Sequence, residues 1–243
     1  MNSLQDWFDS PMYEALYAHR DDQEARQLSE LIKHKFPPSR YPALLDLACG
    51  RGRHTLNLAR LGYAMTGLDL SPRAISIARE KHASQHLEAD FILGDMRDPL
   101  PRTFDGVVNL FTSFGYFDDD AMNRAVLRSI RSMLRPGGFL VLDYLNEHWV
   151  RKTLVPRETG TLPSCEYLIE RWISGSMVMK KITTSRVGSP SKEFNEQVKL
   201  YGEAWFTREL ESLGFKISER VGGYDGSAFD PAGSPRLITM ASL

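Results

Sequence analysis

The 243-residue sequence is poor in cysteine, and its positive and negative charges nearly cancel. Its two cysteines, Cys49 and Cys165, are too few for a disulfide scaffold, so reduced thiols in a cytoplasmic protein are the simpler interpretation. A net charge of −1 gives no global attraction for nucleic acid or for an anionic membrane. No apolar run approaches the roughly 18 residues that a membrane span needs. The N-terminal residues show acids where an export signal would carry basic side chains. We therefore expect a cytoplasmic protein without a membrane span, and nucleic acid is not an expected partner.

What the sequence does contain is a regular alternation of strand-like and helix-like segments. Short apolar runs lie at 43–48, 63–69, 91–93, 105–110 and 139–143, and helical patterns lie at 53–61, 72–83 and 119–134. Alternation of this kind predicts a doubly wound, mostly parallel sheet with helices on both of its faces. The length fits one such α/β domain with an insertion.

Two further segments flank or interrupt this alternation. Residues 11–36 show helical apolar stripes, and residues 166–201 alternate apolar and polar side chains as antiparallel strands do. Helix and strand patterns return at 203–213, 215–219 and 236–241. We predict an N-terminal helical cap over the ligand site (1–40), an α/β domain (41–146 and 203–243) and an antiparallel β insertion (147–202).

Chemically informative residues gather at the predicted carboxyl ends of the strands, where open α/β sheets bind their ligands. Gly50 and Gly52 follow the first strand and allow the backbone to turn tightly and to approach a ligand. Asp69 ends the second strand, near the separation from the glycine turn at which an acid accepts hydrogen bonds from ribose hydroxyls. Up to this point, the pattern suits a dinucleotide as well as other adenosine ligands.

Two departures from the dinucleotide fingerprint narrow the choice. The third position of G-x-G-x-x-G carries Thr55, and Asp46 lies in the strand before the turn. A carboxylate beside the turn suits a ligand with a cationic end better than it suits a pyrophosphate. An NAD-dependent oxidoreductase is therefore disfavoured.

The whole stretch LLDLACGRGRHTLNLARLGYAMTGLDLS resembles motif I and the following acid of class I S-adenosyl-L-methionine (SAM)-dependent methyltransferases. The segments GDMRD (94–98), FDGVVNLFTSFGYF (104–117) and LRPGGFLVLDYLN (134–146) resemble the family's motifs after strand three and at strands four and five. The chain looks most similar to small-molecule N-methyltransferases of the aminosugar and glycine type. This resemblance implies a Rossmann-like, doubly wound, seven-stranded and mostly parallel sheet with an antiparallel β insertion. It also implies SAM as cofactor and S-adenosyl-L-homocysteine as product.

The resemblance further implies a set of cofactor-binding residues. The set comprises Tyr17, Arg20, Asp46, Ala48, Gly50, Gly52, Asp69, Leu70, Gly94, Asp95, Met96, Asn109, Leu110 and Phe111. In it, Asp69 would hold the ribose, Asp95 would face the adenine amino group, and Arg20 would pair with the methionine carboxylate. Core packing is an equal alternative for Tyr17, a solvated ion pair for Arg20, and turn or helix capping for Asp95 and Asn109.

The implied reaction is an in-line displacement that moves the sulfonium methyl group to an amine or hydroxyl of a small molecule. A hydroxyl would need a positioned base, and Tyr116, Asp143 and His148 are the candidate catalytic residues near strand ends. For His148, a structural or surface position is the favoured interpretation. No metal site is predicted.

Two other functions stay open. An RNA or protein methyltransferase ranks lower, because NLFTSF (109–114) lacks the Asp/Asn-Pro-Pro-aromatic signature of base-methylating relatives. A non-catalytic SAM-binding protein is the other alternative. The insertion is expected to form a lid that shapes the acceptor site, and its strand edges are expected to pair two subunits in a homodimer.

Overall fold

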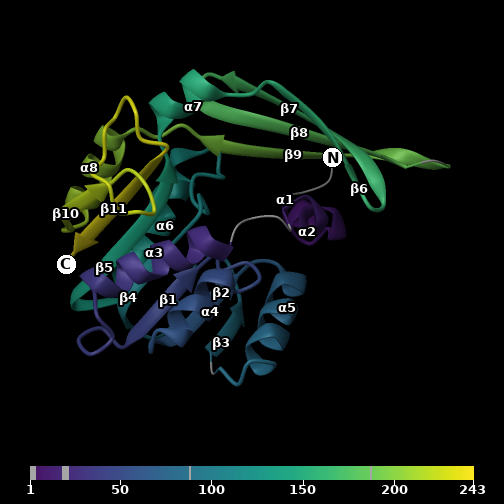
Figure 1. Ribbon diagram of the computed structural model, residues 1–243. Helices are drawn as coiled ribbons and strands as arrows, with labels where there is room; N and C mark the ends of the chain where they lie inside the picture. The colour runs from purple at the N-terminus through teal and green to yellow at the C-terminus, as the bar shows by residue number, and fades with distance from the viewer. Residues whose placement is uncertain (1–3, 18–21, 88, 187) are drawn as a thin grey trace.

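Two sheets organise the chain, a seven-stranded mixed sheet and a four-stranded antiparallel sheet (Figure 1). The computed structural model describes residues 4–17, 22–87, 89–186 and 188–243. The helices are α1 (Leu4–Phe8), α2 (Pro11–Tyr17), α3 (Asp22–Lys35), α4 (Arg53–Arg60), α5 (Pro72–Ala83), α6 (Asp120–Met133), α7 (Glu147–Thr153) and α8 (Glu203–Ser212). The strands are β1 (Ala43–Leu47), β2 (Ala64–Asp69), β3 (Ala89–Leu93), β4 (Phe104–Asn109), β5 (Leu134–Leu145), β6 (Arg157–Leu162), β7 (Cys165–Ser174), β8 (Met177–Arg186), β9 (Ser189–Lys199), β10 (Lys216–Val221) and β11 (Arg236–Ser242).

The larger sheet has the strand order β10-β11-β5-β4-β1-β2-β3, with β11 antiparallel to both of its neighbours. Strand β1 pairs in parallel with β2 on one side and with β4 on the other. The chain order therefore reverses between β1 and β4, and ligands bind beyond the carboxyl ends of strands at such a reversal. The predicted fold, a doubly wound, seven-stranded, mostly parallel sheet with an antiparallel insertion, is confirmed.

The two faces of this sheet are covered by different helices because side chains alternate along each strand. Leu44 of β1 packs with Leu28 of α3 on one face. Its neighbour Leu45 lies on the opposite face, in a cluster with Ile130 of α6 and Phe206 of α8. This three-layer arrangement holds the strand ends in fixed positions around the reversal between β1 and β4.

The insertion forms the second sheet, in which β6, β7, β8 and β9 pair successively as antiparallel neighbours. Helices α1 and α2 lie under this sheet (Figure 1), and Trp7 shares a buried apolar cluster with Ile169, Ile182 and Phe194. The sequence patterns did not indicate β6, because its residues RETGTL carry almost no apolar side chains. They also did not indicate the short helix α7.

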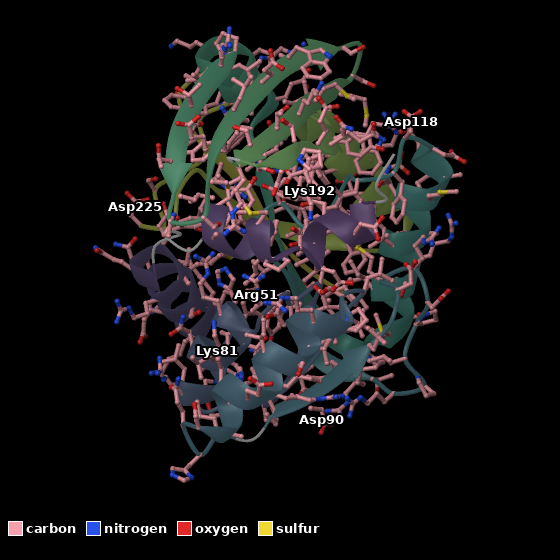
Figure 2. The ribbon with its side chains drawn as sticks, turned by 90° about the vertical axis from the view of Figure 1, so that its right-hand side faces the viewer. Arg51, Lys81, Asp90, Asp118, Lys192 and Asp225 are labelled. Carbon is pink, nitrogen blue, oxygen red and sulfur yellow. The ribbon has the colours of Figure 1, made fainter. Side chains whose placement is uncertain are left out.

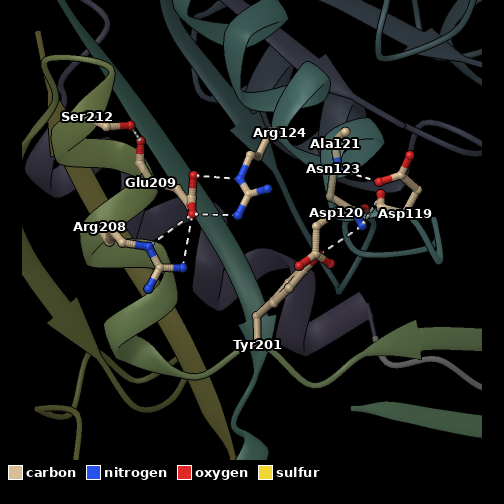
Figure 3. Close-up of polar contacts among 9 residues, drawn as sticks. All are labelled: Asp119, Asp120, Ala121, Asn123, Arg124, Tyr201, Arg208, Glu209 and Ser212. Atoms are coloured by element: carbon tan, nitrogen blue, oxygen red, sulfur yellow. Dashed lines mark hydrogen bonds and ion pairs between the residues drawn. The ribbon is translucent and has the colours of Figure 1, made fainter. Parts of the chain in front are cut away.

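Tyr201 fixes the point at which the insertion returns to the larger sheet (Figure 3). Its hydroxyl donates to Asp120 Oδ1 over 2.6 Å and accepts from Asn123 Nδ2 over 3.0 Å, and both partners lie in α6. Its ring stacks on Trp205 of α8 with the centroids 3.7 Å apart. The second sheet is therefore fastened to the body of the protein by polar and aromatic contacts.

Candidate active site

The glycine turn after β1 leaves space at the point where the chain order reverses. Gly50 and Gly52 both have left-handed backbones, with φ of 55° and 74°. A Cβ at Gly52 would lie 2.9 Å from His82 Cε1 and 3.1 Å from Ala78 Cβ, both in α5. At Gly50, apart from the two neighbouring residues in the chain, no described residue has an atom within 4 Å of such a Cβ. Gly52 therefore lets α5 pack closely, whereas Gly50 borders open space.

Asp46 supports this turn from inside the protein. It is only 2% exposed, and its Oδ2 accepts a hydrogen bond from Thr55 Oγ1 over 2.6 Å. Burial raises the pKa of Asp46 to about 7. Ala48, which lies between Asp46 and the glycine turn in the sequence, has a left-handed φ of 61°. Thr55, which replaces the third glycine of the dinucleotide pattern, thus ties the first turn of α4 to the end of β1.

Asp69 combines the features needed to hold a diol. Its Oδ2 accepts from Gly50 N over 2.7 Å, and its Oδ1 accepts from Ser71 N over 2.9 Å. Because a carboxylate oxygen has two lone-pair positions, each oxygen can accept one further hydrogen bond. Leu70, which follows directly, leaves 46% of its surface exposed. A carboxylate beside an exposed apolar side chain fits the ribose and base of an adenosine.

The turn after β3 is held by a self-contained ion pair. Asp95 accepts from Arg97 N at 2.8 Å, from Arg97 Nε at 3.0 Å and from Arg97 Nη2 at 2.6 Å. The hydrogen bonds from Arg97 lower the pKa of Asp95. Gly94 N donates to Asp69 O over 3.0 Å, and the Met96 side chain packs against the core. Asp95 therefore has the geometry of a turn cap, which was the alternative to its predicted contact with adenine.

The three predicted residues at the end of β4 point in different directions. Asn109 is fully buried, and its Nδ2 donates to Leu47 O over 2.8 Å. Leu110 packs into the core with the strands and α3. Phe111 is only partly buried, and the guanidinium carbon of Arg53 lies 4.9 Å from its ring centroid. Of the three side chains, only that of Phe111 lies outside the core.

The three candidate catalytic residues differ in burial and in hydrogen-bond partners. Asp143 is fully buried and accepts from Arg236, Tyr224 and the Phe111 backbone, a geometry that disfavours a base. His148 is exposed on α7, where its backbone N–H donates to Asn146 Oδ1. Tyr116 is partly buried, with its ring 5.5 Å from that of Phe8. A catalytic role for any of them stays a prediction.

The N-terminal helices connect the second sheet to the start of α5. Glu196 Oε1 of β9 accepts from Trp7 Nε1 and from Tyr17 Oη, the latter over 3.3 Å. At the other end, Asp9 Oδ1 accepts from Ser71 Oγ, two residues after Asp69. Tyr17 thus contacts the second sheet, and Arg20 lies outside the described residues.

Arg51 of the glycine turn lies between these helices and the α/β body (Figure 2). Its guanidinium carbon is 5.7 Å from the ring centroid of Tyr13 in α2. The N-terminal helices therefore cover the glycine turn and Asp69 from the side of the second sheet.

A metal site, a membrane-spanning helix and a cysteine nucleophile each place requirements on the part of the chain that the structure describes. No group of three or more His, Cys, Asp or Glu side chains there is arranged to hold a metal ion. Among the described helices, none is long and apolar enough to cross a membrane. Cys49 and Cys165 form no disulfide, and burial raises the pKa of the Cys49 thiol well above its usual value. Cys49 is therefore a poor nucleophile.

Four charged residues complete the site although the sequence patterns did not single them out: Asp9, Arg97, Glu196 and Arg236. Arg97 lies inside the GDMRD segment, which was a usable signal, and Arg236 is the first residue of a mostly apolar final strand. Asp9 and Glu196 act through partners that are distant in the sequence, so no local pattern marked them.

Comparisons with known proteins agree with this geometry. Residues 44–138 match the family model of a methyltransferase domain. The chain is 26% identical over 212 residues to dTDP-3-amino-3,4,6-trideoxy-alpha-D-glucopyranose N,N-dimethyltransferase of Streptomyces venezuelae, covering 84% of this chain and 86% of that one. It is 30% identical to rat (Rattus norvegicus) glycine N-methyltransferase over 124 residues, covering 45% and 42%. The structure of a SAM-dependent methyltransferase from Clostridium acetobutylicum shares the fold, with a TM-score of 0.81, 22% identity and 96% of each chain covered.

Proposed function

Because this chain is a class I SAM-dependent methyltransferase, we propose that it methylates an amine on a small molecule, and specifically on an aminosugar. The similarity to an aminosugar N,N-dimethyltransferase supports this acceptor class, since it extends over the insertion as well as the α/β body. For the cofactor, the observation that carries the proposal is the hydrogen bond from Gly50 N to Asp69 Oδ2, beside the open space at Gly50 and at the reversal between β1 and β4.

The residues around Asp69 fit the cofactor. Asp69 would accept hydrogen bonds from the ribose hydroxyls with its two remaining lone pairs. Leu70 and Leu93, which are 46% and 54% exposed, would cover the adenine ring. Gly50 would let the backbone lie against the methionine portion. When bound, SAM supplies a methyl group activated by a positively charged sulfur.

The chain's own contribution to the chemistry is alignment and exclusion of water. The rings of Phe8, Tyr13 and Tyr116 form edge-to-face contacts that close the N-terminal side of the site. A charged centre that loses its charge during the reaction reacts faster in a water-poor environment, which these rings would help to provide. An amine that arrives in its neutral form needs no general base, so this acceptor does not require Asp143 or His148.

The proposal also assigns a role to the second sheet and a location to the protein. The second sheet would act as a lid over the acceptor, and its edge strand β6 would pair two subunits in a homodimer. The unpaired cysteines support a cytoplasmic location, and the net charge of −1 gives no support for nucleic acid as acceptor.

Calorimetric titration with SAM and with NADH tests the cofactor, and transfer of labelled methyl groups to dTDP-aminosugars tests the acceptor. We expect SAM binding, no NADH binding, and labelled aminosugar. Asp69→Ala should weaken SAM binding about 10- to 100-fold, since hydrogen bonds to a charged group contribute about 1.5–3 kcal/mol.

Asp105→Ala is the matched control. Asp105 also accepts from a backbone N–H, that of Ala43 over 2.8 Å, but at the amino end of β4. It should lower stability and leave SAM affinity unchanged. Tight NADH binding without SAM binding would refute the cofactor, and SAM binding with methylation of only RNA or protein would refute the acceptor.

A further inference from the structure

The turn that ends β4 has an unusual backbone. Phe111 and Thr112 have φ of 58° and 60°, so two consecutive residues with side chains adopt the left-handed conformation. Each such residue costs on the order of 1–2 kcal/mol and persists only where the surroundings hold it. The turn lies at the reversal between β1 and β4, where the ligand binds.

Asp143 of β5 holds the backbone of this turn from beneath. Its Oδ2 accepts from Phe111 N over 2.7 Å, and its backbone carbonyl accepts from Thr112 N over 3.0 Å. Tyr224 donates to the same Oδ2 over 3.0 Å. The carboxyl group is completely buried, so it needs a counter-ion.

Arg236, the first residue of β11, supplies that counter-ion and reaches the turn itself. Its Nε donates to Asp143 Oδ1 over 2.8 Å, and its Nη2 donates to Thr112 Oγ1 over 2.8 Å. Its guanidinium carbon also lies 5.8 Å from the ring centroid of Phe111. One planar side chain thus contacts both left-handed residues and the acid that orients them.

We propose that Arg236 is a positioning residue for methyl transfer, which fixes the β4 turn and the Phe111 ring at the place where acceptor and methyl group meet. This inference rests on the proposed function. Reacting groups that are misplaced by about 1 Å can lose about 100-fold in rate, so a loosened turn reduces turnover more than binding.

Two variants loosen the turn with different risks to the fold. Arg236→Lys keeps a positive charge beside Asp143 but loses the planar fork that spans Asp143 and Thr112. Thr112→Val keeps the shape of the side chain and removes only the oxygen that Arg236 contacts. If Arg236→Lys does not fold, Thr112→Val still decides the question.

Arg124→Lys is the matched control. Arg124 makes the same kind of two-pronged contact with Glu209, at 2.9 and 3.2 Å, but between α6 and α8 (Figure 3). For every variant, three quantities are measured: hydrogen exchange of the amides at 110–116, SAM affinity by calorimetry, and kcat and KM for methyl transfer.

We expect both turn variants to exchange at least about 10-fold faster at 110–116 and to lose at least about 10-fold in kcat, with SAM affinity within about 3-fold of the wild type. Arg124→Lys should change none of these quantities. Unchanged exchange at the turn, or faster exchange with unchanged kcat, would overturn the inference. A loss confined to SAM affinity would overturn it as well. A wild-type protein that transfers no methyl group would refute the proposed function, while its exchange data would still report whether Arg236 holds the turn.

Discussion

At the scale of single residues, burial and partners decide what each acid of the site can do. Asp143 is buried and forms an ion pair with Arg236, so its role is structural. Each carboxylate oxygen of Asp69 accepts one hydrogen bond from a backbone N–H, and in the proposed function its remaining lone pairs would accept from the ribose. Asp46 has a hydroxyl partner, Thr55, and its pKa is raised to about 7 by burial. The same residue type thus serves as the counter-ion of Arg236, as the proposed ribose acceptor and as an internal support of the glycine turn.

The raised pKa of Asp46 predicts a pH-dependent stability. Between its ordinary pKa of 3.8 and about 7, the folded carboxyl keeps its proton while the unfolded one is ionised, so the folded state binds more protons. Raising the pH through this window therefore destabilises the wild type relative to Asp46→Asn, whose amide oxygen still accepts from Thr55. The relative loss should reach on the order of 4 kcal/mol by pH 8, since one pKa unit is about 1.4 kcal/mol. Urea unfolding of both proteins from pH 4 to pH 8 measures it, and parallel stability curves would contradict it.

At the scale of elements, the glycine turn and the helices beside it are specified by local contacts. Gly52 is the N-cap of α4 and lies against α5, and the N-cap of α5 is Ser71, whose Oγ accepts from Ala74 N over 3.0 Å. Asp69 accepts from Ser71 N at the start of α5 and from Gly50 N in the turn that leads to α4. The same few residues therefore set the start of α5 and the position of the Asp69 carboxylate.

The two glycines of the turn should respond differently to substitution. Gly50→Ala and Gly52→Ala both place a Cβ on a left-handed backbone, at a cost of about 1–2 kcal/mol. Gly52→Ala also forces the new Cβ against His82 and Ala78, which adds about 1–3 kcal/mol. Gly52→Ala should therefore lose more stability in urea unfolding, whereas Gly50→Ala should lose more SAM affinity. Equal stabilities together with equal affinities would refute the division of roles.

Local signals explain which elements could be predicted from the sequence. The predicted helix 72–83 coincides with α5, because the Ser71-Pro72 start is encoded by adjacent residues. Strand β6 escaped prediction because a strand at a sheet edge needs few apolar side chains. The position of Asp143 at a strand end was predictable, but its partner Arg236 lies 93 residues further along the chain. The contacts that define the site's chemistry are those with no local sequence signal.

At the scale of the whole molecule, the N-terminal helices join two parts of the protein that the chain itself connects only distantly. Glu196 on the second sheet accepts from Trp7 and Tyr17 and pairs with Lys180, whose Nζ lies 3.2 Å from Oε2. Asp9 contacts the start of α5. Movement of the second sheet should therefore shift the cover over Asp69.

Glu196→Gln tests this connection. A glutamine side chain has one acceptor oxygen where glutamate has two. It therefore keeps only part of the hydrogen bonds from Trp7, Tyr17 and Lys180. We expect faster hydrogen exchange at 4–17 and a several-fold higher KM for SAM. The control is Glu193→Gln, also on β9, which removes only an exposed pair with Lys181. Unchanged exchange in Glu196→Gln, or an equal effect in both variants, would contradict the connection.

The position of Arg236 in the final strand also has a consequence for the order of events during synthesis. Thr112 leaves the ribosome 124 residues before the arginine that contacts it, and the whole second sheet is made in between. At about 5–20 residues per second, Thr112 waits for about 6 to 25 seconds before Arg236 is made. The contacts of Arg236 with the β4 turn therefore form late, when β11 joins the larger sheet after the second sheet has been made. A nascent chain stalled before β11 would carry Gly50, Gly52 and Asp69 and still lack the arginine that holds the β4 turn.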